Sequence, residues 1–207
     1  MLNEIRNYLD FAGLQYRNPD KAGAEREKML VLRHKGQEAR KAFTELAKAF
    51  QASHPEWQLQ QTSQWMNQAQ RLRPHFWVYL QRDGQVTEPM MAIRLYGSSS
   101  DFGVSLEVSF IERKKDEQTL GKQAKVLEIP TVEGIYYLVY SDGKSQRWDA
   151  NEENRQILRN KLSNQEVRKV LVKIDVPITE NSSEEEIVEA ILKSYDKILP
   201  FYLATRN

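Results

Sequence analysis

The stretch that most constrains the fold covers residues 71–112, where three strand-like segments follow one another with turn signals between them. In the third segment, apolar residues alternate with small or polar ones over 102–110. Neighbouring side chains of a strand point to opposite faces of a sheet, so this pattern predicts a strand with one apolar face. The first two segments contain 75–80 and 90–96, and a turn is expected at Asp83-Gly84. Together the three segments predict an antiparallel meander.

Helices are predicted on both sides of the meander. Apolar residues recur at alternating spacings of three and four over 29–50, which predicts a long amphipathic helix that His54-Pro55 ends. Ser183 and Glu186 form a capping box before an apolar stripe over 187–199, and Pro200 is expected to end that helix. Other patterns predict a short helix over 2–12, strands over 57–62, 125–130, 134–140, 146–148 and 170–176, a helix-breaking connection over 113–123 and a helix capped by Asp149 with Glu152.

These elements predict an α+β fold in one domain over 1–207. Its sheet is expected to be twisted, mainly antiparallel and built from six to seven strands, because hairpins, not alternating strands and helices, fill the middle of the chain. The long N-terminal helix and the C-terminal helix should pack on this sheet. The domain divides into a helical part over 1–54, a sheet-rich part over 56–178 and the C-terminal helix over 183–199.

Composition excludes several classes of chemistry. The chain has no cysteine, so it has no disulfides, thiol nucleophiles or Cys-ligated zinc, in keeping with a reducing cytoplasm, where we expect the protein to reside. It has no apolar run of membrane-spanning length. Its three histidines are scattered and it has no G-x-G-x-x-G motif. We therefore predict a soluble protein without a metal site, a cofactor or a membrane partner.

The best candidate for catalysis is the set Asp101, Glu112 and Lys114, which imitates the acid followed by E-x-K of magnesium-dependent nucleases. Such side chains must converge on one metal ion. Eleven residues of continuous strand would instead separate the two carboxylates by roughly 36 Å, at about 3.3 Å per residue. We therefore keep a nuclease only as a second alternative and commit to no catalytic residue.

The binding candidates lie on the second face of the predicted sheet and on the long helix. If Phe76 faces the core, the aromatic and basic residues of the meander share the opposite face. Such rings can stack on bases while arginines hold phosphates. From the pattern alone we favour a simpler interpretation, in which the 29–50 helix covers these rings as core. The candidates are Arg71, Arg73, His75, Trp77, Tyr79, Arg94 and Tyr96, with Arg26, Arg33 and Arg40 on the helix.

The order of these elements resembles the N-terminal DNA-recognition module of McrB-type restriction proteins. The resemblance rests on a basic helical N-terminus and on the Arg-x-Arg-Pro-x-Phe-Trp segment at 71–77. It also rests on Arg94-Leu-Tyr96, on Gly103-Val-Ser-Leu106 and on a closing helix with Tyr195. It implies a non-catalytic module that recognises DNA. No individual recognition residue is carried over from it.

The prediction for function is thus a non-catalytic intracellular binding module, with nucleic acid, DNA in particular, as its ligand. The formal net charge is only +1, so a nucleic-acid partner must be held by a local basic and aromatic face. The alternative is a protein-interaction or regulatory subunit, which binds a protein partner or forms a homodimer through the same face or the helix seam.

Overall fold

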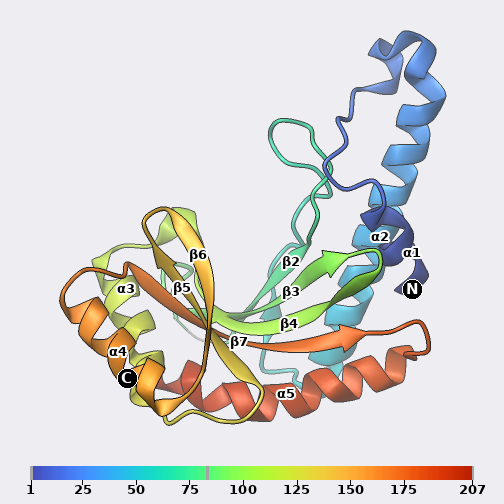
Figure 1. The fold of residues 1–207 in the computed structure, drawn as a ribbon. Coiled ribbons are helices and arrows are strands. Elements are labelled where there is room, and N and C mark those ends of the chain that lie inside the picture. The colour runs from blue at the N-terminus through green and yellow to red at the C-terminus, as the bar shows by residue number, and fades with distance from the viewer. Residues whose placement is uncertain (1, 83, 207) are drawn as a thin grey trace.

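The centre of the protein is a seven-stranded antiparallel sheet in the order β1-β2-β3-β4-β7-β5-β6 (Figure 1). The structure is a computed structural model that describes residues 2–82 and 84–206. Within those residues the strands are β1 (Gln58–Leu59), β2 (Trp77–Gln81), β3 (Met90–Ser98), β4 (Asp101–Ser109), β5 (Ile135–Ser141), β6 (Lys144–Asp149) and β7 (Lys169–Ile178). The predicted α+β class and the antiparallel meander β2-β3-β4 are confirmed. Asp83, half of the predicted first turn, lies outside the described residues.

Two long helices, α2 and α5, cover one side of the sheet, as predicted (Figure 1). The predicted capping box of α5 is present, because Ser183 and Glu186 each bond the backbone N–H of the other. The helices are α1 (Leu2–Leu9), α2 (Arg26–Ser53), α3 (Glu117–Ala124), α4 (Glu152–Ser163) and α5 (Glu184–Ala204), with short 3₁₀ turns η1 (Pro19–Lys21), η2 (Gly23–Glu25), η3 (Glu112–Lys114) and η4 (Lys125–Glu128).

Three local predictions were wrong. The stretch 113–130 is helical where a connection and a strand were expected, because Asp116 and Thr119 form a capping box that starts α3. The cap of α4 is Asn151, which accepts from the N–H of Asn154, since Asp149 still belongs to β6. Pro200 lies inside α5, which continues to Ala204.

The alternation of side chains decides which face of the sheet meets the helices. Phe76 packs its ring against Phe43 of α2 and Tyr8 of α1, and Val78 and Leu80 of β2 lie in the same core. The predicted parity of β2 is therefore correct. We call the other side of the sheet, which points away from α2 and α5, the open face.

The N-terminal half of α2 extends beyond the sheet, and the segment 64–72 rises beside it (Figure 1). Backbone hydrogen bonds tie this segment to the chain before α2: Gly13 donates to Leu72 O and Leu72 donates to Leu14 O. Trp65 anchors the segment against α2, where its ring lies over Gly36. The segment therefore has a fixed place at one border of the open face.

Two helical glycines give a matched prediction for stability. A Cβ at Gly36 would lie 2.5 Å from Trp65 Cε3, whereas a Cβ at Gly121 of α3 would meet nothing within 4 Å. Gly36→Ala should therefore destabilise the fold by about 1–3 kcal/mol, because the buried indole must move. Gly121→Ala should stabilise it by about 0.5–1 kcal/mol through helix propensity. Urea unfolding of both variants measures the two changes in the free energy of unfolding. If both changes have the same sign, the close packing of Trp65 on Gly36 is contradicted.

Candidate functional site

The open face carries the predicted aromatic residues. Trp77 and Tyr79 of β2 are half-buried, and the long helix lies on the opposite side of the sheet. The interpretation favoured from the sequence, that this helix covers the rings, was therefore wrong. Phe76, directly before β2, points to the helices, and the alternation that continues along β2 leaves the ring of Trp77 accessible on the other side.

A buried ion-pair network occupies the centre of the open face. Glu107 of β4 accepts two hydrogen bonds from Arg94 of β3, at 3.0 and 2.8 Å, and its other oxygen lies 3.2 Å from Lys173 Nζ of β7. The Glu107 side chain is 1% exposed. Burial would raise the pKa of this carboxyl, but Arg94 and Lys173 lower it to about 2. Arg94 is thus committed to an ion pair, and the three side chains of the network together carry a net charge of +1.

The ring of Trp77 is bordered by two guanidinium groups. Arg73 lies 4.8 Å and Arg94 5.2 Å from its centroid, and the ring of His75 is 5.7 Å away. Burial and the charges of Arg94, Arg73 and Lys173 lower the pKa of His75 to about 4. Histidine at this position is therefore neutral at pH 7, and the cations around it give this end of the open face a positive potential.

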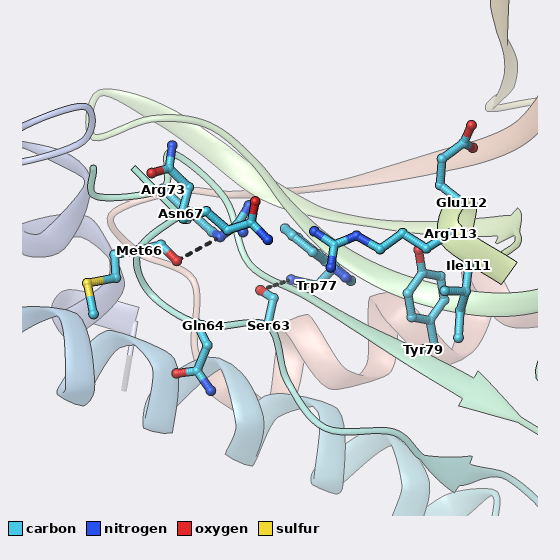
Figure 2. Close-up of a pocket in the computed structure, with 11 residues that line it drawn as sticks. Ser63, Gln64, Met66, Asn67, Arg73, Trp77, Tyr79, Ile111, Glu112 and Arg113 are labelled. Carbon is cyan, nitrogen blue, oxygen red and sulfur yellow. Dashed lines mark hydrogen bonds between the residues drawn. The ribbon is translucent and has the colours of Figure 1, made fainter. Parts of the chain in front are cut away.

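A cavity of about 670 Å³ lies beside Trp77 (Figure 2). One wall is the segment 63–68, the floor includes Trp77 and Tyr79, and the far wall is the residues 111–113 that follow β4. Arg73 is fixed at its edge, because Nε donates to Met66 O at 3.2 Å. The cavity therefore has an aromatic floor and a rim of polar and basic side chains.

Arg113 on the far wall is a site residue that the sequence analysis missed. It is the first residue of the stretch 113–123, which was predicted only as a charged, helix-breaking connection. The sequence contained one weak signal for Arg113. It is a cation that follows directly after a predicted strand, and the strands next to that one carry other site residues. The pairing of β4 with β3 fixes where β4 ends, and η3, which follows it, therefore lies at the border of the cavity.

The other predicted residues are distributed over the molecule. Arg40 donates to the carbonyls of Thr62 and Ser63, and Arg71 donates to Gly13 O, so both hold the segment that walls the cavity. Arg26 and Arg33 are exposed on the N-terminal half of α2. These four arginines therefore do not meet at one point.

Tyr96 lies at a different, acidic end of the open face. Burial, Asp175 and Asp101 raise the pKa of its hydroxyl to about 12. Nearby, Asp175 pairs with Arg147 at 2.8 Å. Tyr96 therefore shares the face with Trp77 but not its positive surroundings.

The nuclease-like set does not converge. β4 is continuous from Asp101 to Ser109, so Asp101 lies at its start and Glu112 beyond its end. Glu112 instead pairs with Lys115 at 2.6 Å and with Lys169 at 2.7 Å. Over 2–82 and 84–206, no three His, Cys, Asp or Glu side chains group in a way that could hold a metal ion.

The low carboxyl pKa values predict a loss of stability in acid. Lys122 and Arg206 lower the pKa of Glu88 to about 2, as Arg94 and Lys173 do for Glu107. Above pH 4.5 these carboxyls are ionised in the folded and unfolded states, so the stabilisation is complete. As pH falls from 4.5 to 2, the unfolded chain binds protons first and the stabilisation is lost. Urea unfolding at pH 7, 4.5 and 3 should show this drop, and Glu88→Gln should reduce it; equal stability at all three pH values would contradict the pairing.

Fold and site together define an α+β chain with an aromatic and basic cavity on an uncovered sheet face. No protein-family model matches the chain, and no curated protein matches it significantly. In the part of the chain that the structure describes, no helix has both the length and the apolar character needed to cross a bilayer.

Proposed function

We propose that the protein binds nucleic acid, DNA in particular, through the Trp77 end of the open face, and that it acts by binding, not catalysis. The observation that carries this proposal is the half-buried ring of Trp77, held beside Arg73 at the floor of a cavity of about 670 Å³. An accessible indole surrounded by cations is a combination that proteins use to bind single-stranded nucleic acid.

The chemistry of each part supports this proposal. An exposed aromatic ring stacks on a base whatever its identity, and each such stack contributes about 1–3 kcal/mol. Guanidinium groups pair with phosphate oxygens in a fixed fork geometry. Arg73 and Arg113 border the cavity, and Arg26 and Arg33 add exposed positive charge on α2. The resemblance to the DNA-recognition module of McrB-type proteins makes DNA the first ligand to test.

The test is a salt titration of binding. Fluorescence anisotropy with labelled single-stranded and duplex DNA of 12 to 20 units, and with RNA of the same lengths, should show binding at low salt. A plot of the logarithm of the binding constant against the logarithm of the salt concentration should be a falling line. Each phosphate contact should add about −0.9 to its slope on duplex DNA and about −0.7 on single strands. Binding that does not depend on salt, or none at low salt, would remove the proposal.

A second candidate function is binding of a protein partner. Two adjoining cavities of about 520 and 260 Å³ lie between α3 and α4 and share Gly121, Ala124, Leu162 and Ser163. A groove between two helices is one kind of surface on which a segment of another protein can dock. Sedimentation equilibrium, together with the salt titration, separates the two functions, because a self-associating chain without nucleic-acid affinity would favour this one.

A further inference from the structure

Two arginines face each other across the cavity on the open face. Arg73 lies at the edge formed by the segment before β2, and Arg113 extends from η3 on the far wall toward Trp77 (Figure 2). Their charges interact. Burial lowers the pKa of Arg73 most, and the nearby charge of Arg113 lowers it further. The fold therefore brings two guanidinium groups to opposite sides of one space.

Neither arginine has a carboxylate partner among the residues that the structure describes. Arg73 instead donates from Nε to Met66 O and lies over the ring of Trp77, which leaves its terminal nitrogens for the cavity. The one carboxylate on the cavity wall, Glu112, is paired with Lys115 and Lys169. The positive charge of this cavity is thus not neutralised from within.

Two like charges that border one space repel, and an anion between them adds two attractions that outweigh this repulsion. We infer that the cavity contains an anion-binding subsite in which a phosphate group is held between Arg73 and Arg113, with the attached ring against Trp77. This inference rests on the proposed function for the source of the phosphate, a nucleic-acid backbone. A free phosphate compound presents the same chemistry, so the test includes both sources.

The experiment follows tryptophan fluorescence while two probes, inorganic pyrophosphate and a twelve-unit oligothymidylate, are titrated into the full chain at low salt. Arg113 is exposed, so Arg113→Gln should leave the fold intact. It should weaken the binding of both probes by about tenfold to a hundredfold, because it removes charge-assisted hydrogen bonds. Arg113→Lys should recover part of the loss. Lys144→Gln, an equal charge change on exposed β6, should leave both affinities within about twofold.

Each outcome has a defined meaning. Oligothymidylate binding that Arg113→Gln leaves unchanged would overturn the subsite while the proposed function survives. Arg113-dependent binding of pyrophosphate without any binding of the oligonucleotide would support the subsite and remove the proposed function. An equal loss of affinity in Lys144→Gln would overturn the subsite, because such a loss reports only the change in net charge. If neither probe binds, both proposals fall.

Discussion

Glu107→Ala should lower the free energy of unfolding by about 3–5 kcal/mol, a larger loss than we expect from any other single substitution on the open face. The carboxylate lies between Arg94 and Lys173 in the centre of the sheet and is 1% exposed. Its removal leaves two cations close together without their counter-ion, and the Lys173 side chain is only 7% exposed, so water cannot take the place of the carboxylate around it. Urea unfolding at pH 7 measures this loss of stability. The m-value, which reports the surface exposed on unfolding, should stay unchanged.

Glu112 provides the matched control. It also pairs with two lysines, but its side chain is 48% exposed. Glu112→Ala should therefore lower the free energy of unfolding by no more than about 1 kcal/mol. Replacing the network as a unit, with Glu107→Leu, Arg94→Met and Lys173→Met, should recover much of the stability lost in Glu107→Ala. Equal effects of Glu107→Ala and Glu112→Ala would contradict the burial of the network.

Trp77→Ala should weaken the binding of single-stranded oligonucleotides by roughly 5-fold to 150-fold, the largest effect on binding that we expect from the loss of one uncharged side chain. The ring is half-buried on the open face, so its loss removes a stacking surface and leaves the core around Phe76 in place. The salt dependence of binding should stay the same, because the indole has no charge. Anisotropy titrations at several salt concentrations measure both quantities.

Trp77→Phe is the corresponding control, because it keeps an aromatic surface at the same position. It should retain most of the affinity, and circular dichroism should show that both variants are folded. If Trp77→Ala binds oligonucleotides as tightly as the unaltered chain, the base-stacking role of this ring is wrong, and the phosphate subsite at Arg73 and Arg113 would have to account for binding alone.

Most of the fold could be predicted because its signals are local. The alternation over 102–110 and the capping box of Ser183 and Glu186 each specify an element without reference to the rest of the chain. The failures occurred where tertiary packing decides. The segment 125–130 has strand-like apolar residues, but Val126 and Leu127 enter the core from a 3₁₀ turn after α3. Pro200 continues α5 because flanking Ile198 and Phe201 are buried on its inner side.

The site was predictable only in part. Alternation placed Trp77 and Tyr79 on one face correctly, but it could not say whether a helix covers that face. That answer depends on how α2 crosses the sheet, which no local pattern encodes. The same limit applies to charge, since Arg94 was expected to be available for a ligand and is paired with Glu107 through the register of β3 and β4. Arg113 was missed because only the three-dimensional fold brings η3 to the cavity.

The most direct measurement of the central claim is the quenching of tryptophan fluorescence by iodide and by caesium. Trp57 and Trp65 are buried, so Trp77 and the half-buried Trp148 should dominate the accessible emission. An accessible and electropositive open face predicts that the ratio of iodide to caesium quenching exceeds that of free tryptophan amide, that Trp77→Phe lowers this ratio, and that a bound oligonucleotide protects the emission. Equal quenching of the unaltered chain and Trp77→Phe, or stronger quenching by caesium, would contradict it.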